Sequence, residues 1–403
     1  MANFGFPKTA THIKTALIAG AAGLAVHTPV QAEQWQLKGT LEMATDEVIG
    51  PITFSPKTDW GDGGHYIAAS VWDQDTRYSA WLWSASSGLR LVEFQDIFPS
   101  LLELRFTPRE VEVVSLSHVL FAHTERELRS WKISDGSLSA RFPLSDEARS
   151  IDTVFVKDHY LVTKEVGGVS MWSKDGAEVS IGELDALRPY EKATVVGDDK
   201  IFLTSGAFTL RMDLEGFDPA TMSLNDAPGS FGPYETFLAA APSGQMIATY
   251  PEVGDDPRWT APVPTVRVWQ NVWAWTGDST AEVEITDFDS PILAAEFSGE
   301  NSMILTVEED GDVTIWQTRD GAKRTHISAA EDRIVSARFT PKASGVVASH
   351  LSGTASLYDV DTGALIQTFP APSSAITFSP DGETMITSGI TKAPARIWRI
   401  TEN

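Results

Sequence analysis

Few residues in this chain have the types and spacing that catalysis or metal binding requires. Six histidines lie beyond residue 32, and the closest pair, His118 and His123, flanks a short strand and could point to different faces. The chain has no cysteine, which excludes zinc–thiolate sites and covalent haem attachment. It also lacks the motifs of serine hydrolases, phosphate loops and zinc proteases. We therefore predict no catalytic residue, no metal ligand and no cofactor.

Two acidic stretches are similar to calcium loops only at first sight. Residues 308–312 read Glu-Glu-Asp-Gly-Asp, and residues 59–64 read Asp-Trp-Gly-Asp-Gly-Gly. Neither has the ligand spacing of an EF-hand. Both fall where a turn between strands is expected, so we interpret them as solvated turns.

Two longer stretches have the composition of interaction loops. Residues 225–233 read NDAPGSFGP, and residues 250–264 contain Arg258 and Trp259 between prolines. An aromatic beside an arginine is a frequent interface anchor. The alternative is a tolerated surface insertion in which Trp259 packs on its own sheet. The candidate interaction residues are Asp226, Phe231, Tyr234, Asp255, Asp256, Arg258 and Trp259.

Three further tryptophans, Trp269, Trp273 and Trp275, lie on one face of a long alternating stretch. This pattern predicts packing on a sheet. The alternative is an aromatic platform for a sugar or a base.

The elements that would carry these residues are short strands in a repeat. Its anchor is an aromatic, or once a methionine, that ends a strand and precedes a glycine-containing turn. The anchors are Trp83, Trp131, Trp172, Met212, Trp275, Trp316, Tyr358 and Trp398. Their spacings are 48, 41, 40, 63, 41, 42 and 40 residues. Upstream stretches such as 102–106 and 335–339 alternate apolar and polar residues, which indicates half-buried strands.

The last repeat is incomplete, and this suggests a role for the start of the chain. Residues 334–369 contain four strand-like runs, whereas the copy that ends the chain contains three. The stretch Gln34–Glu42 alternates and precedes the first full repeat. We predict that it supplies the missing outer strand, so that both ends of the chain pair in one sheet.

These repeats resemble the WD40 family over residues 33–403. The best matches are Phe-Ser-Pro-Asp-Gly at 378–382 and Asp-Gly-Asp-Val-Thr-Ile-Trp at 310–316. The Trp-Asp pair of the family is absent, and Tyr358-Asp359 comes closest to it. The resemblance and the period of about 40 imply an all-β, eight-bladed β-propeller, whose last blade is closed by the N-terminal strand. Seven blades is the alternative, if the unit around Met212 merges with a neighbour.

The first 32 residues differ in kind from the rest. Lys8 and Lys14 are their only formal charges, residues 15–26 form an apolar run, and Val-Gln-Ala precedes Glu33. This is the pattern of a Sec-type signal peptide cleaved after Ala32, and it predicts a periplasmic protein with no stable membrane anchor. The formal net charge of −24 argues against nucleic acid as a partner.

Function is predicted only as a class. The resemblance implies a non-enzymatic propeller that acts as a protein–protein interaction scaffold in the cell envelope and binds a protein partner in the periplasm. The alternative is a propeller that binds a cofactor or ligand in its channel, either a quinone or haem for redox chemistry or a carbohydrate. The turn at 361–365 resembles one that recurs in quinone-binding propellers, although Phe369 follows it where those carry a tryptophan.

Overall fold

The computed structural model shows an all-β chain whose strands all lie in the second of its two units, Ala32–Asn403. The structure describes residues 33–57, 63–73, 78–97, 101–107, 112–117, 127–143, 150–156, 159–164, 168–173, 178–180, 192–196, 200–205, 208–213, 235–251, 264–270, 272, 283–328 and 332–401. The signal peptide predicted at residues 1–32 lies outside this set. The described residues contain strands and no α-helix.

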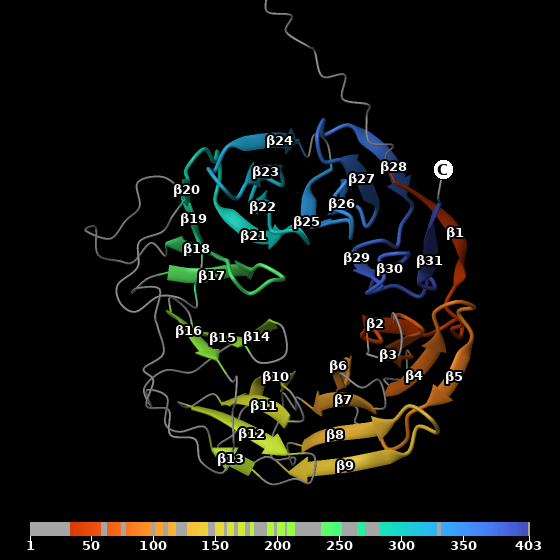
Figure 1. Ribbon diagram of the computed structural model, residues 1–403. Coiled ribbons are helices and arrows are strands. Elements are labelled where there is room, and N and C mark those ends of the chain that lie inside the picture. Colours follow the sequence, from red (N-terminus) through yellow and green to blue (C-terminus); the bar gives the residue numbers. More distant parts are fainter. Residues whose placement is uncertain are drawn as a thin grey trace, which may run out of the picture. The chain divides into compact units, whose positions relative to one another are not determined.

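The strands form antiparallel sheets in which sequence neighbours are hydrogen-bonded neighbours (Figure 1). The first sheet consists of β2 Val48–Phe54, β3 Tyr66–Trp72, β4 Tyr78–Ser84 and β5 Arg90–Glu93. The second consists of β6 Leu101–Phe106, β7 Glu112–Ser117, β8 Glu127–Lys132 and β9 Leu138–Pro143. The third consists of β10 Ser150–Val156, β11 His159–Lys164, β12 Gly168–Ser173 and β13 Glu178–Ser180. The fourth has three described strands, β14 Lys192–Val196, β15 Lys200–Ser205 and β16 Phe208–Asp213.

The second half of the chain continues the pattern. The fifth sheet consists of β17 Glu235–Ala240, β18 Ile247–Pro251, β19 Val266–Trp269 and β20 Val283–Ile285. The sixth consists of β21 Ile292–Phe297, β22 Met303–Glu308, β23 Val313–Gln317 and β24 Lys323–Ile327. The seventh consists of β25 Ile334–Phe339, β26 Gly345–His350, β27 Ala355–Asp359 and β28 Leu365–Phe369. In Figure 1 the first strand of each of these sheets lies nearest the centre of the unit.

The last sheet joins the two ends of the described chain. Its order is β1-β31-β30-β29, with bounds β1 Gln34–Thr40, β29 Ala375–Phe378, β30 Thr384–Ser388 and β31 Arg396–Thr401. β1 runs antiparallel to β31, from Gln34 opposite Thr401 to Thr40 opposite Arg396, with an irregularity between Leu37 and Gly39. This is the pairing predicted for residues 34–42.

The core lies between neighbouring sheets. Buried side chains of the fifth and sixth sheets, such as Val268 and Trp316, form one cluster, and those of the sixth and seventh form another. A further cluster joins Trp83 of the first sheet to Ile397 of the last. The sixth, seventh and last sheets therefore have both faces covered, which explains why their second strands β22, β26 and β30 are buried along their whole length.

The anchor lies at the end of a third strand, as predicted, in six repeats, whereas Trp398 lies within β31, which continues to Thr401. Trp83, Trp131 and Trp316 are among the largest fully buried side chains. The prediction was wrong for the fifth repeat, where the third strand ends at Trp269 and not at Trp275. Three tryptophans within seven residues left the period ambiguous. The structure selects Trp269 because it packs in a buried cluster with Phe202 and Ile247.

Candidate binding surfaces

The candidate residues of the predicted interaction loops lie outside the described residues, but the strands that hold the loops are described, and β18 extends to Pro251 of the second loop. Asp226, Phe231 and Tyr234 precede β17, and the stretch containing Trp259 follows β18. Glu235 at the start of β17 is the cross-strand partner of Pro251 at the end of β18. Both loops therefore leave the sheet at the same end, as the sequence predicted. In each sheet, the described second strand ends and the third begins at this same end.

At this end, the seventh and last sheets present exposed apolar side chains. Leu351, after β26, is 71% exposed, and Ile390, after β30, is 83% exposed. The Ala371–Pro372 segment lies between the turns that carry Leu351 and Ile390. On one side, the N–H of the following residue, Ser373, donates to the Gly353 carbonyl at 2.7 Å. On the other side, a Cβ added at Gly389 would lie 2.9 Å from the Pro372 side chain.

Basic residues adjoin these apolar residues through a backbone hydrogen bond or in the sequence. The Leu351 N–H donates to the carbonyl of exposed Arg333 at 2.8 Å, and exposed Lys392 lies two residues after Ile390. Arg396 donates to the Pro370 carbonyl at 2.7 Å. We call the surface made by Leu351, Ala371, Ile390, Arg333 and Lys392 the apolar turn surface.

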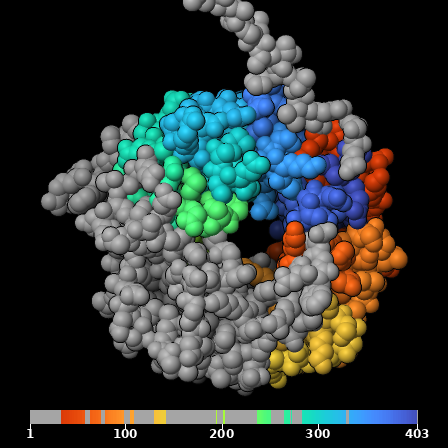
Figure 2. Space-filling view, in the orientation of Figure 1, coloured from red at the N-terminus to blue at the C-terminus, as the bar shows by residue number. Residues whose placement is uncertain are grey.

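A cavity of about 440 Å³ that is open to solvent lies at the opposite end of several first strands. Its walls include the phenylalanines that end four of these strands, Phe54, Phe297, Phe339 and Phe378. Prolines of the following turns, Pro242, Pro341 and Pro380, also line it. In Figure 2 the unit is hollowed near its centre, beside green residues of β17 and blue residues of the last sheets. The sequence showed the repeated strand-ending phenylalanines but not that they converge on one space.

One ion pair lies among these apolar walls. Arg338 Nε donates to Glu296 Oε2 at 3.1 Å, and its Nη1 donates to the Ile376 carbonyl at 3.3 Å. The other oxygen of Glu296 accepts the Phe339 N–H at 3.2 Å. Burial raises the pKa of Glu296 above its ordinary value, while the charge of Arg338 acts in the opposite direction. Glu296 and Arg338 are the only charged residues that line the cavity within the described part of the chain.

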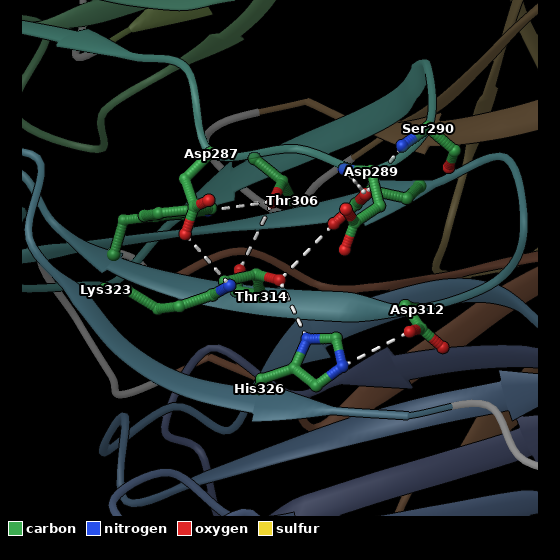
Figure 3. A network of polar contacts seen from close by, with 10 residues as sticks. Asp287, Asp289, Ser290, Thr306, Asp312, Thr314, Lys323 and His326 are labelled. Atoms are coloured by element: carbon green, nitrogen blue, oxygen red, sulfur yellow. Dashed lines mark hydrogen bonds and ion pairs between the residues drawn. The ribbon is translucent and has the colours of Figure 1, made fainter. Parts of the chain in front are cut away.

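A second polar group lies inside the sixth sheet (Figure 3). The buried carboxylate of Glu308 accepts the N–H groups of Asp289 and Ser290, each at 3.2 Å, and the hydroxyl of Thr314 at 3.3 Å. The Thr314 hydroxyl also contacts His326 Nδ1 at 3.2 Å. On its other side, His326 Nε2 lies 3.2 Å from Asp312 Oδ2 (Figure 3). Burial raises the pKa of Glu308, and the N–H groups of Ser290 and Asp289 oppose that shift.

This network shows what the acidic stretch at 308–312 does. It forms a hairpin turn, as predicted, because the Gly311 N–H donates to the Glu308 carbonyl at 2.9 Å. Glu308, however, is buried and not solvated, since its oxygens bind the connection that enters β21. Within the described ranges, no group of three or more His, Asp or Glu side chains is arranged to hold a metal ion. His118 and His123 lie outside those ranges.

Three buried tryptophans each donate a hydrogen bond to a threonine. These threonines were not among the residues predicted from the sequence. Trp269, Trp316 and Trp398 donate their indole N–H to the hydroxyls of Thr249, Thr306 and Thr387 at 2.8, 2.9 and 3.0 Å. In each case the threonine lies inside the second strand of the same sheet. The detectable signal was a threonine at the middle of each of those apolar strands.

Comparison with known proteins finds similarity in structure. No family model and no curated protein matches the chain. The C-terminal WD40 domain of Sif2 superposes with a TM-score of 0.61 at 12% identity, over 92% of this chain and 99% of that one. The fold is a WD40-like β-propeller.

Two further solved structures are similar over a comparable share of the chain. The Dos1 propeller gives a TM-score of 0.63 at 12% identity, over 90% of this chain and 95% of that one. The computationally designed Ika8 protein gives 0.60 at 14% identity, over 89% and 98%. These similarities cover nearly the whole unit of strands, and they concern the fold of the chain. No helix in the part of the chain that the structure describes is long and apolar enough to cross a bilayer.

Proposed function

We propose that this propeller is an exported, non-enzymatic scaffold that binds a protein partner in the periplasm. The observation that supports it is the apolar turn surface, where Leu351 and Ile390 are 71% and 83% exposed. Apolar side chains that are gathered on one face and rimmed by polar residues are typical of interaction sites. The predicted loops at 225–233 and 250–264 begin at the same end of the sheets, so the partner surface would extend toward them.

We further infer eight blades, with the last one closed by β1. Eight separate sheets among the described residues support this number, and β14–β16 form a sheet of their own around Met212. The pairing of β1 with β31 supports closure, because it completes the last sheet to four strands with a strand from the other end of the described chain.

The proposed compartment rests on the sequence of the first 32 residues. We expect a Sec-type signal to be removed after Ala32 and to leave a protein with no stable membrane anchor and no affinity for nucleic acid, given the net charge of −24. Fractionation followed by mass measurement tests this. The proposal requires a periplasmic chain that begins at Glu33, and a full-length chain retained in the membrane would contradict it.

The scaffold function is tested by crosslinking in the native envelope. The double variant Leu351→Asn/Ile390→Asn should lose a partner that the parent protein recovers reproducibly. The matched control is Leu89→Asn/Leu91→Asn, which changes leucines that are 56% and 49% exposed in the first sheet. Equal recovery by both variants would refute the role of this surface.

The cavity of about 440 Å³ favours the alternative of a channel that holds a cofactor or ligand. Native mass spectrometry and absorption beyond the aromatic band distinguish the two functions. A bound quinone, haem or sugar in protein purified from its own host would favour the alternative.

A further inference from the structure

The cavity at the ends of the first strands has one ion pair in its wall. Phenylalanines, prolines and the threonines Thr53, Thr340 and Thr377 also line it, and Arg338, whose side chain is 51% exposed, is the cationic residue among them. A site of this composition would bury an apolar group and orient it through one charged contact.

Arg338 is held in place and retains donors. A guanidinium has five N–H donors. Glu296 binds Nε and the Ile376 carbonyl binds Nη1, so two of the donors have partners among the described residues. The remaining N–H groups belong to a side chain whose position is already fixed, which lowers the entropy lost when a ligand binds.

Glu296 does not offer an equivalent site for a cation. One of its oxygens accepts from Arg338 and the other accepts the Phe339 N–H. The Glu296 carboxylate therefore positions the arginine. The hydrogen-bonding groups that remain for a ligand are the N–H groups of Arg338.

We propose that this cavity binds a carboxylate carried by an apolar group, with Arg338 as the residue that contacts the carboxylate. The planar guanidinium matches a carboxylate geometrically. The phenylalanine walls accommodate the apolar part, and the volume of about 440 Å³ lies in the range of small-ligand sites. The carboxylate has two possible sources, a free organic acid or the C-terminus of a peptide. This proposal does not depend on the scaffold function.

The test is a calorimetric titration of the purified full chain with 3-phenylpropionate and with its amide, 3-phenylpropanamide. The acid should bind at least about tenfold more tightly than the amide, because a hydrogen bond between a guanidinium and a carboxylate is stronger than one between a guanidinium and a neutral amide. Arg338→Gln should remove this preference. Arg319→Gln, which changes an exposed arginine in the turn between β23 and β24, should keep it.

A second variant separates binding from folding. Arg338→Gln leaves Glu296 without its cation, so the double variant Glu296→Gln/Arg338→Gln is measured beside it, and thermal unfolding shows that each is folded. Both variants should lose the acid. Equal binding of acid and amide, undiminished binding by a folded Arg338 variant, or no binding of the acid by the parent protein would each overturn the proposal.

The source of the carboxylate is decided by a second pair of ligands. Ala-Ala-Phe with a free C-terminus and its C-terminal amide are titrated in the same way. Tighter binding of the peptide acid than of 3-phenylpropionate would identify a peptide terminus as the ligand. Exclusion of the peptide, with the small acid still bound, would identify a free organic acid.

Discussion

The indole N–H of Trp316 is buried, and its hydrogen bond to the Thr306 hydroxyl is therefore a structural contact that water cannot replace. The Thr306 hydroxyl in turn donates to the Thr314 carbonyl at 3.3 Å. The same tryptophan–threonine bond occurs in the fifth and last sheets. These bonds fix the second and third strands of a sheet relative to each other through their side chains.

Thr306→Val keeps the shape of the side chain and removes this acceptor. It should lower the free energy of unfolding by about 1–3 kcal/mol, because a buried donor is left without a partner. Thr368→Val on β28 is the control: Thr368 is exposed, so its effect should stay within about 0.5 kcal/mol. Denaturant unfolding measures both. Equal effects would mean that the hydroxyl of Thr306 contributes nothing specific.

At the scale of residues, the sequence predicts the buried anchors and not their partners. Trp131 and Trp316 follow from the period of the repeat, since a large aromatic at the end of a strand must be covered. The partners depend on the cross-strand register, which a period does not specify. Thr306 is not directly opposite Trp316 in the register of β22 and β23, where Ile304 is. For the same reason, the inward position of Glu308 could not be predicted from a run of acidic residues.

Among the strands, β1 is hydrogen-bonded both to its own sheet and to a side chain of the neighbouring sheet. The backbone N–H of Trp35 donates to Gln367 Oε1 at 3.0 Å, and the Gln367 amide donates to the Trp35 carbonyl at 2.7 Å. Gln367 lies on β28 of the neighbouring sheet, so its side chain satisfies main-chain groups on the free side of β1. The Trp35 side chain packs on Phe378, with ring centroids 5.7 Å apart. β1 is thus held by the last sheet and by its neighbour.

Trp35→Ala should destabilise the protein by about 3–5 kcal/mol, because it removes a large buried side chain from the cluster with Phe369 and Trp398. Leu37→Ala on the same strand is the control. Leu37 is 48% exposed, and its replacement should change the free energy of unfolding by no more than about 0.5 kcal/mol.

Deletion of residues 33–43 extends this test from the side chain to the strand. The last sheet would lose its outer strand and should unfold at a lower temperature. An unchanged melting temperature after deletion would show that β1 does not stabilise the sheet.

The position of β1 could be predicted by counting strands, because the last repeat contains one fewer than a complete sheet. The register in which β1 pairs with β31 could not be predicted from the sequence. The irregularity between Leu37 and Gly39 shifts the pairing by one residue, and the alternation of residues 34–42 gives no sign of it. The cavity was also beyond sequence analysis, since Phe54, Phe297, Phe339 and Phe378 come from positions far apart in the chain.

For the molecule as a whole, charge is the dominant property. The chain has 55 acidic and 31 basic residues. With a net charge of −24, repulsion between like charges destabilises the folded state. Described ion pairs such as Arg267–Glu284 and Lys323–Asp287 are largely exposed, so each contributes little. Self-repulsion should therefore outweigh the attraction within these pairs.

Raising sodium chloride from about 0.01 to about 0.1 M shortens the Debye length from about 30 to about 10 Å. The melting temperature should rise over this range, because long-range repulsion is screened more than contacts between paired groups. Scanning calorimetry measures the change, and a matched series with sucrose controls for the effect of the added solute. A fall in the melting temperature would mean that ion pairs dominate.

The contact between Gln34 and Thr401 has a consequence for how the protein is made. The hydroxyl of Thr401 donates to the carbonyl of Gln34, 367 residues away. Closing a loop of this length costs about 5 kcal/mol of chain entropy. β1 is synthesised well before β31, so it cannot pair until β31 is also available. Until then Trp35 lacks its partner strand, and a chaperone that covers β1 would protect the molecule when it is most prone to aggregate.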